Sequence, residues 1–283
     1  MSFVAEDELI ALYDYRSESD LVGAALKQAC ADPLALVRFL GRYTAWNALF
    51  GAGVAALAGN IARSPALFLD PAAPFKAVAD RSVYVASFFF DAARDEFDDR
   101  DTRHRDTHRC LAQATVSGTV EFFLRRGVLK DVGLVEVLLA EPLWLAALRE
   151  RVGIGYGIFP DGRPFALFRA MGYHLGSELL ADREFSLLDQ TLRATQPALV
   201  GFLNDHEVDI AGQVHNAYRW IRVHSGHGGR AEADHFRWAV HGVEEAFRFI
   251  DPGRHADLRH QLHLGFLDFV ADHREFFHQV NSG

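Results

Sequence analysis

Histidines and acids are concentrated between Tyr218 and His241, in a segment that otherwise has the composition of a buried helix. Glu232 and His235 are three residues apart, and His224 precedes them by eight and eleven residues. At 3.6 residues per turn these offsets are about 80° and about 20°, so an unbroken helix would carry all three side chains on one face. Such a face could bind a metal ion, and a polar helix with solvated histidines is the alternative.

Glycines stand between His224 and Glu232, at positions 226, 228 and 229. Glycine lacks a Cβ and loosens a helix, so a break in this stretch would leave only Glu232 and His235 rigidly paired. His227 lies inside the same stretch and offers a second imidazole. The sequence therefore leaves open whether His224 or His227 joins the pair.

A second group of acids and histidines follows an apolar run that begins at Tyr84. Glu96 ends that run, a polar break covers residues 98–101, and His104 and His108 come after it. A solvated, charged helix end is one interpretation. The other is a metal site formed by Glu96 with His104 or His108, because carboxylate and imidazole are both common metal ligands.

A third group contains His174 and Glu178, which are four residues apart, and Asp182, which follows after four more. A helix would place all three on one face. A hydrogen-bonded pair inside the core is one interpretation of His174 and Glu178. A metal-binding carboxylate is the alternative for Glu178.

The elements that must position these groups have the apolar spacing of helices. Asp32-Pro33 is a typical helix start, because aspartate accepts hydrogen bonds at the N-cap and proline suits the first turn. The spacing predicts two short helices within residues 3–30. Further helices are expected to begin at residue 33, near 75, at 166 and at 230, and others to span residues 110–126, 132–150 with a break near Pro142, and 205–223. A last helix is expected over residues 253 to about 278, and a loop over 153–165.

No alternating strand pattern and no internal repeat is visible, so we expect an all-α fold. Roughly ten helices, many of them strongly apolar, predict a layered helical bundle. We expect one domain, residues 1–283, in which residues 1–74 cover a metal-binding bundle formed by residues 75–283.

The charge balance excludes some partners. The 283 residues include 38 acids and 29 bases, a net charge of −9, with no basic block. Attraction to phosphates dominates nucleic-acid binding, so we expect no nucleic-acid partner. Cys30 and Cys110 are far apart, which suggests neither a disulfide framework nor a thiolate zinc site.

Targeting signals are weak. The first residues carry acids where a signal peptide carries bases. Thr44–Ala62 is the segment nearest to a membrane span, but Asn47, Asn60 and many small residues favour a closely packed internal helix. We therefore expect a cytoplasmic protein that does not enter the membrane.

The three groups share one property, since each combines an acid with a histidine inside an apolar helix. A buried carboxylate or imidazole costs several kcal/mol unless it is paired or coordinated, so we expect the groups to converge. Two metal ions with carboxylate and histidine ligands would satisfy them, as in the di-iron sites of helical bundles. Nitrogen and oxygen ligands without thiolate suit iron or manganese.

These residues resemble the ligand motifs of the heme-oxygenase-like di-iron oxidases and oxygenases, also described as iron-containing redox enzymes. DEFDDRDTRHRDTHRCL is similar to the family's Glu-aromatic segment followed by His-x-x-Leu, with Glu96 and His108 in the ligand positions at a longer interval than usual. GSELLADREF is similar to the central helix that supplies a further glutamate, with Glu178 as first choice and Glu184 as second. The resemblance covers roughly residues 75–280.

The family's last ligand helix reads His-x-x-x-Asp/Glu-x-x-His, and Glu232 and His235 match its final two positions. Gly228 occupies the position of the first histidine, so the sequence departs from the motif and either His224 or His227 takes that role. The metal ligands that the resemblance implies are Glu96, His108, Glu178, His224, Glu232 and His235.

The resemblance implies a fold and an activity: a heme-oxygenase-like bundle that binds two Fe2+ ions per chain and uses O2 as co-substrate. The substrate would be a small metabolite such as an amino acid or amine, changed by N-oxygenation, desaturation, C–C cleavage or cyclisation in secondary metabolism. The many arginines and histidines favour a substrate with a carboxylate. An external electron donor and a homodimer are both compatible with such an enzyme.

Alternatives of other classes stay open. One is a metal-free helical binding protein, or a cofactor-independent enzyme, of the same superfamily fold. Another is thiamin-fragment hydrolysis, which needs a cysteine nucleophile; Cys110 is the candidate, but its neighbours do not mark it as activated. The metal content of the purified chain distinguishes these possibilities from a di-iron enzyme.

Overall fold

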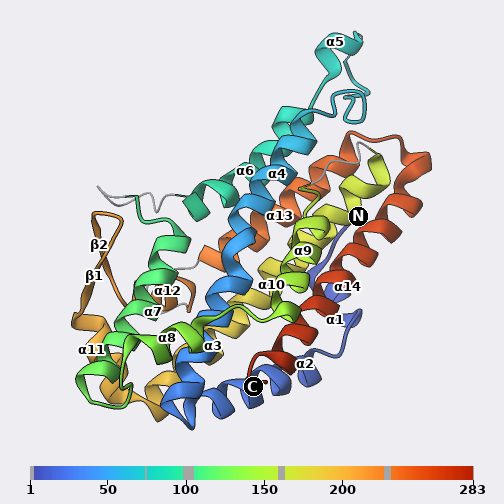
Figure 1. Ribbon diagram of the computed structural model, residues 1–283. Helices are drawn as coiled ribbons and strands as arrows, with labels where there is room; N and C mark the ends of the chain where they lie inside the picture. Colours follow the sequence, from blue (N-terminus) through green and yellow to red (C-terminus); the bar gives the residue numbers. More distant parts are fainter. Residues whose placement is uncertain (1–2, 74, 98–104, 159–162, 226–230, 283) are drawn as a thin grey trace.

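Helices make up most of the computed structural model shown in Figure 1. The structure describes residues 3–73, 75–97, 105–158, 163–225 and 231–282; for residues 231–233 it describes the backbone but not the side chains. The prediction of a helical fold is confirmed. The α-helices are α1 (Glu6–Ala11), α2 (Tyr15–Cys30), α3 (Pro33–Trp46), α4 (Phe50–Ala62), α5 (Lys76–Ala79), α6 (Ser82–Phe97), α7 (His108–Arg125), α8 (Val132–Leu139), α9 (Leu143–Gly155), α10 (Pro164–Thr195), α11 (Pro197–Asp205), α12 (Arg219–His224), α13 (Ala231–Arg248) and α14 (His255–Gln279).

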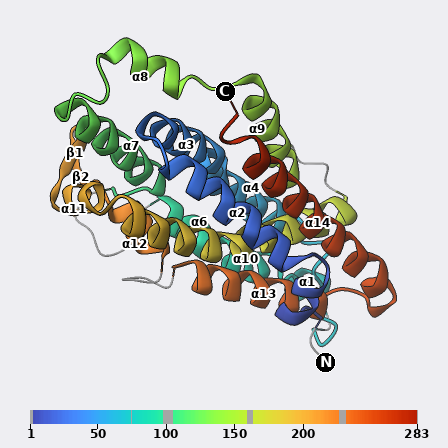
Figure 2. The same cartoon turned by 90° about the horizontal axis from the view of Figure 1, so that it is seen from below.

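The 32-residue helix α10 is the central element. It packs along α14 and also contacts α13, α2 and α12, and Figure 2 shows it between α2 and α13. A Cβ on Gly172 would lie 1.9 Å from the carbonyl oxygen of Leu262, and one on Gly265 would lie 1.8 Å from that of Arg169. The α10 and α14 backbones therefore touch, and both positions require glycine.

Helix α6 packs against both α4 and α13, as Figure 1 shows. Val85, Phe89 and Ala92 bury one face of α6. Across residues 98–104 the chain continues to α7, where the hydroxyl oxygen of Thr107 accepts a hydrogen bond from the Cys110 amide. This N-cap starts α7 at His108 and fixes that residue in the first helical turn.

The segment from residue 205 to 223 is not the helix that its apolar residues predicted. It forms β1 (Glu207–Ile210), β2 (Gln213–Asn216) and then the short helix α12. Ala211 and Gly212 connect the strands with φ of 56° and 83°, which is the conformation of a two-residue hairpin turn. The helix prediction was based on only a few apolar residues, and the hydrogen bonds between the two strands determine the conformation of this segment instead.

The hairpin also changes the segment from Tyr218 to His241. Helix α12 ends at His224, and α13 begins at Ala231 after five residues that the structure does not describe. An unbroken helix through this segment is therefore wrong. His224 and His235 belong to separate helices, so their relative position depends on tertiary packing.

Two predictions concern the middle of the chain. The break near Pro142 is confirmed, since α8 ends at Leu139 and α9 begins at Leu143. The loop over residues 153–165 is shorter than predicted, because α9 continues to Gly155 and α10 already begins at Pro164.

One helical stretch, Pro33–Ala62, is long and apolar enough by length and composition to cross a membrane. It comprises α3, a 3-10 turn (Asn47–Leu49) and α4. Tyr43, Trp46 and Leu57 from this stretch are almost completely buried in the core. These three residues face the core, whereas 33% of the apolar 18-residue window is buried, so the internal helix and the cytoplasmic location both stay predictions.

Candidate metal centre

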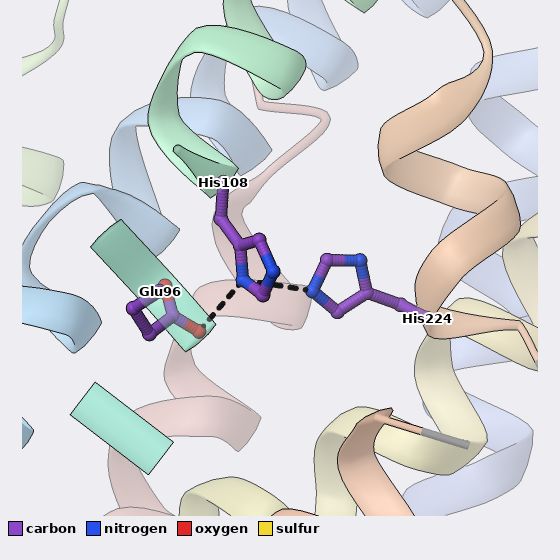
Figure 3. Close-up of side chains that lie close together, drawn as sticks. All are labelled: Glu96, His108 and His224. Carbon is purple, nitrogen blue, oxygen red and sulfur yellow. Dashed lines mark hydrogen bonds and ion pairs between the residues drawn. The ribbon is translucent and has the colours of Figure 1, made fainter. Parts of the chain in front are cut away.

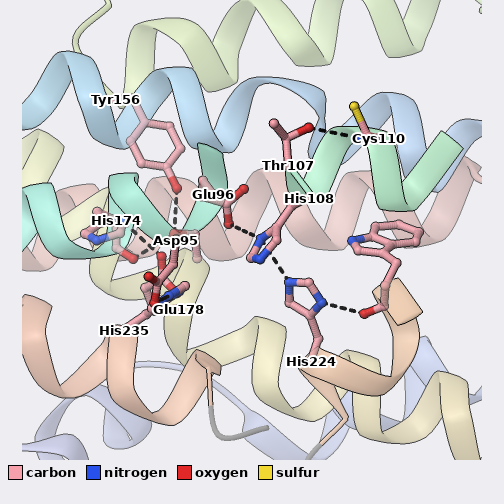
Figure 4. Close-up of polar contacts among 12 residues, drawn as sticks. Asp95, Glu96, Thr107, His108, Cys110, Tyr156, His174, Glu178, His224 and His235 are labelled. Carbon is pink, nitrogen blue, oxygen red and sulfur yellow. Dashed lines mark hydrogen bonds and ion pairs between the residues drawn. The ribbon is translucent and has the colours of Figure 1, made fainter. Parts of the chain in front are cut away.

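Five helices bring acids and histidines together around the middle of α10, as Figure 4 shows. We call these side chains the candidate centre. They are Asp95 and Glu96 from the end of α6, His108 from the start of α7, His174 and Glu178 from α10, His224 from the end of α12 and His235 from α13.

The first group of the centre consists of Glu96, His108 and His224, with His108 in the middle (Figure 3). The Nδ1 atom of His108 is 2.9 Å from Oε1 of Glu96 and 3.2 Å from Nε2 of His224. One ligand atom from each residue lies within 4.8 Å of the other two. Among the residues that the structure describes, no other three acids, histidines or cysteines meet this criterion.

The orientation of His224 determines which nitrogen faces its neighbours. Its Nδ1 is 2.6 Å from the carbonyl oxygen of Trp220, and a carbonyl can only accept, so Nδ1 carries the proton. Burial, followed by the nearby imidazole of His108, holds the pKa of His224 well below its usual value. His224 is therefore neutral, and its Nε2 directs a lone pair toward His108.

The second group of the centre consists of Asp95, His174, Glu178 and His235. Glu178 lies between two histidines, with Oε1 3.3 Å from Nδ1 of His174 and Oε2 3.4 Å from Nδ1 of His235. The Nε2 atom of His235 is 3.3 Å from Oδ2 of Asp95. These distances are longer than the roughly 2.9 Å of a typical N–H···O hydrogen bond, so each of these three contacts is a long one.

His174 is fully buried, with its ring 5.7 Å from that of Phe89 and 5.9 Å from that of Tyr156. Within the described part of the chain, neither ring nitrogen has a hydrogen-bond partner. Burial lowers the pKa of His174 and favours the neutral ring. A buried imidazole without hydrogen bonds is costly, which makes this side chain a candidate ligand.

The two groups form one centre. Asp95 and Glu96 are consecutive on α6, and Glu178 lines the same cavity as Glu96, His108 and His224. The charge on Glu178 also acts on the pKa of His224. A pair of cations bound here would therefore be close neighbours.

The structure describes the side chains of five of the six predicted ligands, and it brings these five together: Glu96, His108, Glu178, His224 and His235. Glu232 lies in the first turn of α13, but its side chain is outside the described part of the molecule. The alternatives His104 and His227 also lie outside the described residues.

Asp95 and His174 belong to the centre but were not predicted as ligands. Each had a sequence signal, since Asp95 directly precedes Glu96 and His174 is one helical turn before Glu178. Glu184, the second choice for the central glutamate, lies away from the centre, where its Oε2 is 2.8 Å from Nε2 of His273.

A cavity of about 250 Å³ adjoins the centre and is lined by Glu96, His108, Glu178 and His224 together with mostly apolar residues. Cys110, the candidate nucleophile for thiamin-fragment hydrolysis, is not among the residues described as lining it.

Comparison with protein-family models, with curated proteins and with solved structures finds no match to this chain. The donor atoms alone then indicate what the centre can bind. They are carboxylate oxygens and imidazole nitrogens without thiolate, a set that suits iron, manganese or zinc rather than copper(I) or an iron–sulfur cluster.

Proposed function

We propose that this chain is a non-heme di-iron enzyme that uses O2 to oxidise a small metabolite. The observation that carries the proposal is the convergence of Glu96 Oε1, His108 Nδ1 and His224 Nε2, with spacings of 2.9 and 3.2 Å. Two ligand atoms that each lie about 2.1 Å from one metal ion are about 3 Å apart. The spacings of the first group fit such a pair of bonds.

The second group would hold the second ion. Glu178, His235 and Asp95 supply its ligand atoms, and His174 adds an imidazole whose buried nitrogens have no hydrogen-bond partner in the described structure. A bound cation would compensate the burial of these polar atoms. The donor set of both groups together matches the carboxylate and histidine composition of di-iron bundle proteins.

Iron in this centre would supply the electrons that activate O2. The surrounding residues orient the ligands and limit access of water. The Trp220 carbonyl fixes the ring of His224, and the ring of Phe185 stacks on it with centroids 4.4 Å apart. Such outer contacts hold a ligand in position and raise its basicity.

The proposal extends to the heme-oxygenase-like arrangement of the helices, to an external electron donor and to a cytoplasmic location. The six predicted ligands support it, because their segments resemble the ligand motifs of the heme-oxygenase-like di-iron enzymes in the same order along the chain.

Iron content tests the proposal. Full-length protein is loaded with Fe2+ without O2 and desalted, and we expect about two iron ions per chain and consumption of O2 on exposure. We expect Glu96→Ala and His224→Ala to lose one ion and His235→Ala to lose the other. His278→Ala, on the exposed side of α14, should keep both.

Wild-type protein that retains no iron under these conditions would overturn the proposal. The chain would then be a metal-free binding protein or a cofactor-independent enzyme. Equal iron content in the wild type and in all three centre variants would overturn the assignment of the ligands.

A further inference from the structure

We infer that the cavity beside the candidate centre takes a small, mostly apolar substrate with one carboxylate, and that Arg109 binds this carboxylate. The inference rests on the proposed function, because that function makes the ligand a substrate. The cavity lies between the first group of the centre and residues of α3, α4 and α7.

The walls away from the centre are mostly apolar. Phe50, Val54, Phe185 and Trp220 contribute apolar surface, and small side chains fill much of the rest. A cavity of about 250 Å³ is smaller than the roughly 300–1,000 Å³ typical of sites for drug-sized ligands. Its size and lining therefore fit a small metabolite with an apolar body.

Arg109 is the only lysine or arginine among the described residues that line this cavity. It follows His108 in the first turn of α7, and its Nη1 donates a hydrogen bond of 2.8 Å to the carbonyl oxygen of Thr44. A guanidinium has five N–H donors, and the described part of the chain offers Arg109 no other hydrogen bond and no ion pair.

The neighbouring arginines are used differently. The Nη1 of Arg149 donates to both carboxylate oxygens of Glu141, at 3.0 and 2.8 Å. The Nη1 of Arg42 donates to two carbonyl oxygens of the C-terminal segment. Arg109 is thus the cation whose remaining donors face a ligand site.

A carboxylate is the group that such donors select. Arginine binds it through two parallel N–H···O bonds, and the charge assists both. Arg109 as a whole is an exposed residue, but the partial burial of its guanidinium, followed by the nearby charge of Arg149, lowers its pKa, so an anion at this position would stabilise the charged form. The same positive charge would repel a protonated amine.

A second cavity of about 500 Å³ shares Thr44 and Arg109 with the first. It is lined by residues of α3 and α7, by the connection between α8 and α9, and by residues 209–211 of the hairpin. The Arg109–Thr44 contact therefore stands at the junction of the two cavities. A substrate that enters through this second, outer cavity would keep its carboxylate at Arg109 and extend its apolar body through the first cavity toward the candidate centre.

Hexanoate, hexylamine and hexanol test the inference, because they share an alkyl body and differ in head group. Their Kd values for the full-length protein are measured by ligand-observed NMR at fixed ionic strength. Hexanoate should bind the wild type about tenfold more tightly than the other two, as expected for hydrogen bonds to a charged group. Arg109→Leu should abolish this preference and leave the binding of hexanol unchanged.

Two further variants serve as controls. Arg109→Lys keeps the charge but loses the planar fork, so it should recover part of the preference for hexanoate. Arg149 lines the second cavity but not the first, so Arg149→Leu should leave the preference for hexanoate unchanged.

Iron content measured on the same samples separates this inference from the proposed function. Equal binding of hexanoate by the wild type and Arg109→Leu, or tightest binding of hexylamine, would overturn the inference at any iron content. Binding of hexanoate that depends on Arg109 in a chain that retains no iron would support the anion site and overturn the proposed function.

Discussion

Two buried groups of histidine and carboxylate lie along α10, and they use their imidazoles in different ways. One is the His273 cluster, which we define as Glu18, Glu184 and His273. Nδ1 of His273 donates to Glu18 at 2.8 Å, and Nε2 lies 2.8 Å from Glu184. Tyr43 donates its hydroxyl proton to the other oxygen of Glu184 at 2.7 Å. Every polar atom of this ring therefore faces a carboxylate.

The candidate centre contains histidines that are buried like His273, whereas the side chains of its acids Asp95 and Glu96 are 22% and 21% exposed. There, however, Nε2 of His224 faces a nitrogen of His108, and both nitrogens of His174 lack hydrogen-bond partners within the described residues. The pKa values move in opposite directions, lowered for His224 and raised for His273. Burial alone thus does not distinguish a structural histidine from a ligand; the atoms that face its ring do.

The largest expected effect is on stability. In metal-free protein, His273→Gln removes the charge between two buried glutamates and should destabilise the fold by about 3–5 kcal/mol. His224→Asn places an amide N–H near the position of Nδ1, keeps a donor for the Trp220 carbonyl and should cost only about 1 kcal/mol. Urea unfolding of both variants measures the difference, and equal losses would show that the two groups are both structural.

The next effect is on the pH dependence of stability. Burial acts to lower the pKa of His273, but hydrogen bonds to Glu18 and Glu184 outweigh it and raise the pKa to about 9. A raised pKa means that stabilisation is fully present below the ordinary pKa of 6.5 and is lost as the pH rises through about 9.

The stability difference between wild type and His273→Gln should therefore shrink by on the order of 3 kcal/mol between those two pH values. Unfolding curves of both proteins at several pH values provide the measurement, since titrating groups outside the His273 cluster cancel in the difference. A difference that is constant with pH would mean that His273 does not carry a proton in the fold.

The smallest effect compares two glycines of α4. A Cβ on Gly51 would lie 3.0 Å from Cβ of Glu96 and 3.4 Å from its Oε2, so Gly51→Ala must displace this ligand slightly. We expect about tenfold weaker Fe2+ binding, measured by competition with a chelator.

Gly59→Ala is the matched control, because a Cβ there meets nothing within 4 Å. It should leave Fe2+ affinity unchanged and stabilise α4 by up to about 1 kcal/mol. Equal affinities of the two variants would mean that the position of Glu96 does not matter to the metal.

Local patterns predicted the helices and much of the candidate centre. Apolar spacing identified α10, and the acid–histidine spacing selected Glu178 on it. The sequence paired Glu96 with His104 or His108 across a polar break, because these residues lie where one helix ends and the next begins. In the structure, Nδ1 of His108 lies 2.9 Å from Oε1 of Glu96. The His174–Glu178 spacing lies within about one helical turn, whereas Glu96 and His108 are twelve residues apart and were linked by their residue types.

Other parts depended on contacts between distant segments. Glu184 lies on the same helix as Glu178, and only its contacts with Tyr43 on α3 and His273 on α14 show that it belongs to the His273 cluster. After the hairpin that follows Asp205, His224 lies on its own short helix, α12. The angular spacing of residues along one helix could not predict this. His174 looked like a packed core residue, and its lack of hydrogen bonds appears only in three dimensions.

The close approach of the α10 and α14 backbones at Gly172 and Gly265 has a consequence for motion. A slip by one turn, about 5.4 Å, in one direction would bring Phe168 against the Leu262 carbonyl, and in the other it would bring Leu180 to the place where Gly176 meets Phe269. The two helices therefore have a single axial register, and Glu178, six residues along α10, has a fixed height relative to the C-terminal helix. A rearrangement that admits a substrate would then occur in the other helices that line the cavity, α3, α4, α6, α7 or α12, against a stationary α10.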